Sequence, residues 1–237
     1  MKRQELSKRL TMVTDFILEE SRLADIGSDH AKLPCFAIEN GLATFAIAGE
    51  VNEGPLRSAE RNIRLRGLET SIKAKLGNGL EVLVGEHVDT ITVAGMGGPL
   101  IARILNEGQQ YLNSKVKRLI LQPNIAADHI RKWLIENEWT LIAEKILEED
   151  DHVYEILVAE RGDGHAAYLN QNVEKALWLG PYLLKQKDDV FKKKWTKELE
   201  QLRKVNDQLK IADQTPKLIE KRKEMTQLMN WLEEELR

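Results

Sequence analysis

The stretch RLADIGSDHAKLPCFAIENG, residues 22–41, carries the pattern that decides the fold. Its first five residues form a short β-prone run, and residues 31–40 have the apolar spacing of a helix. Gly41 follows that helix, at a position where a left-handed C-terminal residue is favoured. A strand, a tight loop and a helix in this order are typical of a parallel sheet covered by helices.

The same alternation of β-prone runs and amphipathic helices continues to residue 160. The expected strands cover residues 22–26, 44–48, 72–76, 90–94, 118–121, 140–146 and 153–159. Only residues 148–151 separate the last two strands, which is too short for a crossover helix, so we expect an antiparallel hairpin. The sequence therefore predicts an α/β fold with a Rossmann-like sheet of seven strands, mainly parallel, with an antiparallel last strand.

The composition changes after Gly162, where a turn-rich linker leads into a sequence dominated by helix formers. Apolar residues then form two helical stripes, namely Phe191, Trp195, Leu199, Leu202, Val205 and Leu209, then Leu218, Met225, Met229, Leu232 and Leu236. Thr215 and Pro216 should be the N-cap and first residue of the second helix, so the chain should reverse near residues 212–215. We expect domains at residues 1–162 and 163–237, the second an antiparallel, coiled-coil-like helical hairpin. Two roles are open for this hairpin: packing or dimerisation, and gripping RNA.

The 237-residue chain has a net charge of −3, which is unevenly distributed. Residues 1–160 hold 19 basic and 25 acidic residues, whereas residues 161–237 hold 16 and 13. A basic C-terminal region favours a polyanionic partner, although a solvated charged helix explains the asymmetry equally well. No apolar run approaches the roughly 20 residues that span a bilayer, and the lone Cys35 should be an inert buried thiol. We expect a cytoplasmic monomer that binds neither membrane nor metal.

Acidic residues follow the first two expected strands, at the edge of the sheet where open α/β folds bind ligands. A dinucleotide-binding loop would present three glycines to a pyrophosphate, but here only Gly27 is glycine, and Asp25 and Asp29 lie beside it. Glu50 ends the second strand, 25 residues after Asp25, where an acceptor for ribose hydroxyls is expected. Three carboxylates disfavour phosphate and suit a cationic nucleoside, of which S-adenosylmethionine is the common example. Helix-capping Asp residues beside a turn are the structural alternative.

Glycine-containing or polar loops also follow the next three strands. Asn78 and Gly79 follow the third strand in LGNGL (76–80), whose two glycines permit a tight turn. The fourth strand ends in VAGMGG (93–98), which leaves room for a planar group close to the backbone, and the fifth delivers QPN (122–124). Each loop alone is equally compatible with a plain turn or cap. The fourth loop lacks the acid or amide, two prolines and aromatic residue found in many amino-directed DNA methyltransferases.

These loops, in this order and spacing, resemble those of class I S-adenosylmethionine-dependent methyltransferases over residues 1–160. The strings ADIGSDHAKLP (24–34), VAGMGG (93–98) and LQPN (121–124), followed by a helical hairpin, resemble the bacterial tRNA (adenine-22 N1) methyltransferase family over the whole chain. The resemblance implies methyl transfer from S-adenosylmethionine to N1 of adenine 22 in tRNA. The cofactor-binding residues that it implies are Asp25, Gly27, Asp29, Glu50, Asn78, Gly79, Ala94, Gly95 and Met96. One departure from the class is the loss of the usual glycine-rich loop after Asp25.

Methyl transfer to N1 of adenine needs no protein nucleophile, because the sulfonium is already activated, so positioning should dominate. The product ring is cationic, and a carboxylate near the base could stabilise the developing charge or accept an N6 proton. Asp29 is the first candidate for this role, with cofactor orientation as its rival role. His30 could assist proton transfer or be a bystander, and Tyr154 could stack on a flipped base or belong to the core.

Several basic clusters are candidate RNA contacts, although each alone is usually a solvated surface. They comprise Lys2, Arg3, Lys8 and Arg9, then Arg57, Arg61, Arg64 and Arg66 on a helix over residues 55–66, and residues 192–194 and 221–223. Arg57, Arg61 and Arg64 share one helix face, where only Glu60 should compete. Two further functions stay open: methylation of another RNA, a protein or a small molecule, and tRNA binding by a module with a vestigial cofactor pocket.

Overall fold

The computed structural model describes residues 6–211 and 215–237. The chain divides into two compact units, Met1–Asn170 and Gln171–Arg237. Two expectations concern residues outside the described ranges: the chain reversal at residues 212–214, and the RNA contacts of Lys2 and Arg3.

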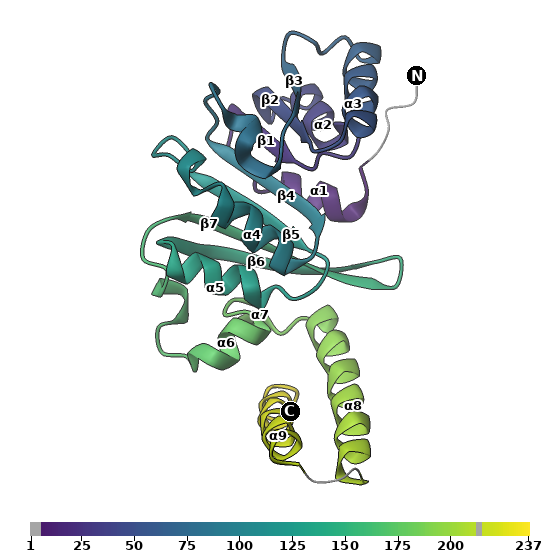
Figure 1. Cartoon of the computed structure of the whole chain (residues 1–237), viewed down its shortest axis with the longest axis vertical. Coiled ribbons are helices and arrows are strands. Elements are labelled where there is room, and N and C mark those ends of the chain that lie inside the picture. Colours follow the sequence, from purple (N-terminus) through teal and green to yellow (C-terminus); the bar gives the residue numbers. More distant parts are fainter. Residues whose placement is uncertain (1–5, 212–214) are drawn as a thin grey trace. The chain divides into compact units, whose positions relative to one another are not determined.

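The first unit is built on a seven-stranded sheet with the strand order β3-β2-β1-β4-β5-β7-β6 (Figure 1). Its strands are β1 (Ser21–Ile26), β2 (Ala43–Glu50), β3 (Ile72–Leu76), β4 (Thr90–Met96), β5 (Arg118–Pro123), β6 (Trp139–Glu149) and β7 (His152–Arg161). Strands β1 to β5 pair in parallel, whereas β7 is antiparallel to both β5 and β6. The predicted sheet of seven strands with an antiparallel last strand is therefore confirmed.

The β6–β7 hairpin is longer than the sequence pattern predicts. Glu148 and Glu149 belong to β6, so only Asp150 and Asp151 form the turn. These two residues have φ values of 49° and 61°, the left-handed conformation of a two-residue turn that matches the twist of antiparallel strands. The expected four-residue connection was wrong, because acidic side chains continue to the end of a strand that is exposed at its tip.

Helices cover both faces of the sheet, as right-handed crossovers between parallel strands require (Figure 1). On one face lie α1 (Lys8–Thr14), α2 (Lys32–Glu39) and α3 (Glu53–Leu65), and on the other α4 (Gly98–Glu107) and α5 (Asp128–Glu136). Short 3-10 turns are η1 (Gly79–Leu83), η2 (Gln109–Tyr111) and η3 (Ala166–Tyr168). Gly41 and Gly67 follow α2 and α3 with φ values of 70° and 68°, as the helix-end pattern predicts.

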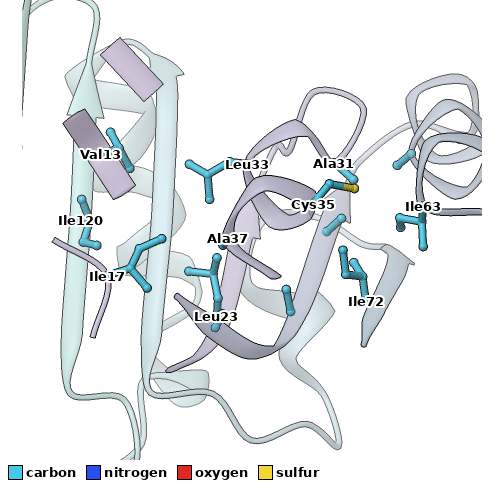
Figure 2. Close-up of a cluster of buried hydrophobic side chains, with 14 of the residues drawn as sticks. Val13, Ile17, Leu23, Ala31, Leu33, Cys35, Ala37, Ile63, Ile72 and Ile120 are labelled. Atoms are coloured by element: carbon cyan, nitrogen blue, oxygen red, sulfur yellow. The ribbon is translucent and has the colours of Figure 1, made fainter. Parts of the chain in front are cut away.

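A cluster of buried apolar side chains lies between the sheet and helices α1 to α3 (Figure 2). Leu23 of β1, Leu33 of α2 and Ile120 of β5 are at most 1% exposed, and each such burial contributes about 1.5–3 kcal/mol. Cys35 is fully buried in the same cluster, and this burial raises the pKa of its thiol to about 11. The thiol therefore stays protonated at neutral pH, and the packed layer holds the ends of the strands in fixed positions.

A buried ion cluster ties α5 to the β6–β7 hairpin. Arg131 is fully buried, its Nε donates to Glu144 at 2.7 Å, and its Nη2 lies 2.5 Å from Glu155. Burial opposes the charge of Arg131, but the two carboxylates outweigh it and raise the pKa of the guanidinium. Sequence analysis missed this cluster because its members come from three different elements and form no local pattern.

The second unit is helical, with α6 (Val173–Leu179), α7 (Leu183–Gln186), α8 (Asp189–Ile211) and α9 (Pro216–Glu235). Helices α8 and α9 pack against each other, and Arg203 of α8 lies 2.7 Å from Glu233 of α9 (Figure 1). The Thr215 hydroxyl accepts a hydrogen bond from the Leu218 N–H at 3.3 Å, and Pro216 is the first helical residue. The predicted start of the second long helix is confirmed; the coiled-coil character stays a prediction.

The first half of the predicted stripe on α8 is buried. Phe191, Trp195 and Leu199 are at most 7% exposed. Val205, however, is 38% exposed, whereas the neighbouring Asn206 is 8% exposed, so this part of the stripe was wrong. At 100° per residue, Asn206 lies on the helix face marked by Trp195 and Leu199, whereas Val205 lies at the edge of that face.

The boundary between the two compact units, after Asn170, lies later in the sequence than the composition change at Gly162. The intervening turn η3 contacts β6, and its Ala167 and Tyr168 are buried. This short segment therefore packs with the sheet although its sequence is turn-rich. The limits 1–162 and 163–237, as independently folding domains, stay a prediction.

Candidate functional site

The loops that follow β1, β2 and β4 start side by side at the carboxyl edge of the sheet. Ile26 of β1 lies opposite both Gly49 of β2 and Val93 of β4. The acidic loop after β1, the carboxylate of Glu50 and the glycine loop after β4 therefore leave the sheet at neighbouring positions. Parallel pairing brings together most of the residues that the sequence implicates.

Asp25 is the buried anchor of the first loop, with 4% exposure. Its carboxylate accepts a hydrogen bond from the Thr92 hydroxyl at 2.6 Å and another from the Ser28 hydroxyl at 2.7 Å. Burial raises the pKa of Asp25, while these two hydrogen bonds favour the ionised form. Asp25 thus joins β1, its own loop and β4 into one rigid edge.

Glu50 presents a buried carboxylate at the end of β2, with 6% exposure. Within the described part of the chain, its Oε1 has no hydrogen-bond partner. Burial and then the charge of Asp25 raise the pKa of Glu50, and a hydrogen bond from the His30 backbone opposes this effect. A buried acceptor without a donor destabilises the fold, which makes Glu50 suited to a ligand that supplies hydroxyl donors.

Gly27, which follows β1, lies against the side chain of Met96, which ends β4. Gly27 has a φ of 71°, and its N–H donates to the Gly49 carbonyl at 2.9 Å. A Cβ at Gly27 would lie 2.3 Å from the Met96 Cε, so any side chain there would have to displace Met96. Glycine is needed here for both its backbone conformation and its size.

A left-handed turn replaces the glycine-rich loop of the general class. Asp29, His30 and Ala31 have φ values of 44°, 67° and 56°, although left-handed backbone costs a non-glycine residue about 1–2 kcal/mol. The Asp29 side chain is 67% exposed and lies 2.9 Å from the Lys32 Nζ, and the His30 ring lies 3.5 Å from it. Backbone strain of this kind concentrates at functional sites, and it directs the Asp29 carboxylate away from the core.

Asn78 and Gly79 connect β3 to η1 at the same edge. Asn78 is exposed, and its backbone N–H donates to the Glu81 carboxylate at 3.0 Å. Gly79 has a φ of 56°, and a Cβ there would lie 3.0 Å from Ile104 of α4. A small cavity is lined by this turn and by α4, so these two residues border a space next to the edge.

Polar side chains at the end of β5 bind the glycine loop after β4. The fully buried Gln122 accepts hydrogen bonds through Oε1 from the Gly95 N–H, at 2.9 Å, and from the Arg9 guanidinium. Asn124 donates through Nδ2 to the Gly95 carbonyl at 2.9 Å. The Arg9 guanidinium lies 5.2 Å from the centroid of the Tyr154 ring. The sequence indicated polar groups here, but Gln122 was not among the predicted site residues, because its partners are far away in the sequence.

The arginines expected on α3 are exposed, but one has an unforeseen partner. Arg57 lies 3.2 Å from Glu53, one turn earlier on the same helix, so Glu60 is not the sole competing acid. Arg61 and Arg64 are exposed, and Arg61 lines a surface groove together with His30. A further arginine on this helix that the sequence suggested, Arg66, is instead half-buried against Glu39.

The other predicted RNA contacts lie on different elements. Lys8 is exposed on α1, and Lys192 and Lys193 are exposed on α8 of the second unit. In the described ranges, no cluster of three or more His, Cys, Asp or Glu side chains could hold a metal ion. None of the helices within those ranges is long and apolar enough to cross a membrane.

Comparison with known proteins gives a consistent set of relatives. The sequence model of a family described as tRNA (adenine(22)-N(1))-methyltransferase matches residues 23–234. The protein of that description from Bacillus subtilis (strain 168) is 47% identical over 99% of this chain and 98% of its own length. The crystal structure of the B. subtilis m1A22 tRNA methyltransferase TrmK superposes with a TM-score of 0.94, covering 98% of this chain and 99% of that one. Streptococcus pneumoniae Sp1610, in complex with S-adenosyl-L-methionine, is 40% identical with a TM-score of 0.84, covering 98% and 100%.

Proposed function

Because the chain belongs to the tRNA (adenine(22)-N(1))-methyltransferase family, we propose that the carboxyl edge of its sheet binds S-adenosylmethionine and presents the methyl group to N1 of adenine 22 in tRNA. The chain is an S-adenosylmethionine-dependent tRNA methyltransferase. The observation that carries the assignment to this edge is Glu50, whose buried carboxylate has one oxygen with no partner among the described residues. Ribose hydroxyls are donors that would satisfy it.

The remaining cofactor contacts follow from the same edge. Asp25 holds the loop through Thr92 and Ser28, and the absence of a side chain at Gly27 leaves room for Met96. The full set that we propose around the cofactor is Asp25, Gly27, Asp29, Glu50, Asn78, Gly79, Ala94, Gly95 and Met96. Three nearby carboxylates favour a ligand with ammonium and sulfonium charges over one with a pyrophosphate, because like charges repel strongly at a buried site.

The bound cofactor supplies an activated methyl group on a positively charged sulfur. A new bond forms between adenine N1 and the methyl carbon as the bond between carbon and sulfur breaks, and sulfur keeps the electron pair. Positive charge thereby moves onto the adenine ring, and the other product is S-adenosylhomocysteine. The contribution of the chain is alignment of the two reactants and stabilisation of the charge that develops on the base.

Asp29 is the residue that we propose for charge stabilisation, with His30 beside it and Tyr154 at the base. Its carboxylate is exposed at the edge, so it is accessible to a base that enters from solvent. A carboxylate near the ring stabilises a cation in the transition state more than it stabilises the neutral substrate. The rival role, orientation of the cofactor alone, predicts a different kinetic result.

Asp29→Asn should lower the single-turnover rate of tRNA methylation by about 10- to 100-fold while changing the dissociation constant of S-adenosylmethionine little. Asn tolerates the left-handed backbone at this position, so it removes the charge without adding strain. Asp29→Ala removes the charge and adds strain, so only this variant should also lose thermal stability. A rate that recovers fully at saturating cofactor would make Asp29 a binding group.

The tRNA is bound, in this proposal, by exposed basic side chains on both units. They are Lys8, Arg57, Arg61, Arg64, Lys192 and Lys193, whereas Arg9 is half-buried. We further propose that the protein acts in the cytoplasm, where tRNA is processed, and as a monomer, because one chain supplies every residue of the proposed site. Phosphate contacts of this kind position the substrate without reading its sequence.

Arg57→Ala combined with Arg61→Ala should weaken tRNA binding and reduce the slope of log affinity against log salt concentration by about 2, one for each phosphate contact. Glu53→Gln is the matched control: it releases Arg57 from its partner and should strengthen tRNA binding. Filter binding over a salt series measures both effects, and calorimetry should show unchanged cofactor affinity. An unchanged salt slope in the double variant would remove α3 from the tRNA-binding surface.

A further inference from the structure

Arg9 makes contacts at the carboxyl edge that differ from those of a surface phosphate ligand. Its guanidinium donates to the Gln122 Oε1 and lies 5.2 Å from the centroid of the Tyr154 ring. Gln122 is fully buried, and Arg9 itself is half-buried. A residue that only meets phosphates gains nothing from being held in one orientation over an aromatic ring, so this geometry calls for another explanation.

The backbone of Arg9 is also held in place. The Glu149 carboxylate, at the tip of β6, accepts hydrogen bonds from the backbone N–H groups of Lys8 and of Arg9, the latter at 3.3 Å. The Lys8 ammonium donates to the Glu148 carbonyl at 3.2 Å. The start of α1 is therefore clamped to a hairpin about 140 residues away in the sequence, and this clamp fixes the point from which Arg9 reaches inward.

The same contacts connect Arg9 to the loop proposed to lie beside the transferred methyl group. The Gln122 Oε1 accepts from both the Arg9 guanidinium and the Gly95 N–H. A Cβ built at Gly95 would lie 3.6 Å from the Arg9 Nη1. The guanidinium thus lies next to the backbone of Gly95, with the Tyr154 ring on one side of it.

We infer that Arg9 is a base-stacking residue: its guanidinium plane, backed by the Tyr154 ring and oriented by Gln122, is the surface on which the target adenine packs. This inference rests on the proposed function and deepens it by naming what holds the base. Splayed-out bases in RNA stack on arginine planes as well as on aromatic rings. Stacking uses the planarity of the guanidinium, whereas a phosphate contact uses mainly its charge.

The charge of Arg9 has a second consequence in this arrangement. Adenine enters as a neutral ring and leaves as a cation after methylation. A guanidinium that stacks on the substrate base therefore repels the product base, which favours release of methylated tRNA. Wild-type protein should bind unmethylated tRNA more tightly than methylated tRNA, and this preference should shrink when the charge at position 9 is removed.

The test compares Arg9→Lys, which keeps the charge and loses the plane, with Arg9→Gln, which loses the charge and carries only a smaller planar amide. We expect Arg9→Lys to lower kcat/KM for tRNA on the order of 10- to 100-fold, the range expected for loss of one stacking contact, with unchanged cofactor affinity and salt slope. Arg9→Lys should retain the preference for unmethylated tRNA, and Arg9→Gln should lose it. The matched control is Arg103→Lys on the exposed part of α4, which should change none of these values.

Two results would overturn the inference. Near-normal kcat/KM in Arg9→Lys would show that charge suffices, as would a salt slope that falls by about 1 in Arg9→Gln, the signature of a phosphate contact. If thermal unfolding shows that the Arg9 variants do not fold, Tyr154→Phe and Tyr154→Leu decide instead: loss of the ring in Tyr154→Leu should lower kcat/KM for tRNA at least about 10-fold below that of Tyr154→Phe, and equal values would overturn the inference. Absence of tRNA methylation by the wild-type protein would refute the proposed function itself, whereas an active wild type with active Arg9→Lys refutes only the stacking role.

Discussion

Glu50→Ala is expected to weaken S-adenosylmethionine binding on the order of 10²- to 10⁴-fold, because hydrogen bonds to a charged group contribute about 1.5–3 kcal/mol each and two ribose hydroxyls would donate to this carboxylate. Isothermal titration calorimetry with S-adenosylmethionine and S-adenosylhomocysteine measures the loss directly. The two ligands should lose affinity to a similar extent, since they share the ribose. Unchanged affinity for both would remove Glu50 from the cofactor site.

The control for Glu50 is stability in the absence of ligand. A buried carboxylate with an oxygen that lacks a donor destabilises the folded chain, so Glu50→Ala should leave the melting temperature unchanged or raise it. Glu69→Ala, on an exposed segment between α3 and β3, should affect neither stability nor cofactor binding. A variant that loses cofactor affinity and much stability together would instead indicate a damaged fold.

The pH dependence follows from the same carboxyl group. Burial raises the pKa of Glu50, so the folded chain binds this proton more tightly than the unfolded chain does. The contribution of Glu50 to stability is therefore present below its ordinary pKa and is lost as the pH rises through the raised value. Cofactor affinity should change in the opposite direction, falling as the pH is lowered through that value, and Glu50→Gln should reduce this dependence to the part that comes from Asp25, whose pKa burial also raises.

A chain truncated after Asn170 is expected to bind S-adenosylmethionine normally and to methylate tRNA at least about 10²-fold less efficiently, because loss of several phosphate contacts removes most of the affinity for tRNA. The first unit retains the whole seven-stranded sheet and its buried core, and every proposed cofactor-binding residue precedes Asn170. The removed unit contains the basic region of α8. Calorimetry with the cofactor and methylation of intact tRNA give the two readouts.

A full-length variant separates the effect of the positive charge on α8 from the effect of removing the whole helical unit. Lys192→Glu combined with Lys193→Glu leaves the buried face of α8 intact and reverses the charge of an exposed segment. This variant should reproduce part of the loss in tRNA methylation, with unchanged cofactor affinity. A truncated chain that remains folded and methylates tRNA at the full rate would make the helical unit a packing or assembly element.

The sequence by itself determined the elements and their order. Strand and helix periods are local properties, and glycines mark the helix ends, so the seven strands and the helical hairpin were predictable. The sheet edge was predictable as well, because parallel strands gather their carboxyl ends. The proximity of Asp25 and Glu50 was therefore predictable from the sequence.

Only the tertiary structure decided which side chains touch. The hydrogen bond between Arg9 and Gln122 joins residues 113 positions apart, and Arg131 of α5 contacts Glu144 of β6 and Glu155 of β7. Nothing in a local pattern distinguishes such residues from solvated charges, because burial depends on what packs over them. Val205 shows the same limit: the helix period predicts which face it lies on, but packing around α8 leaves it 38% exposed while the neighbouring Asn206 is buried.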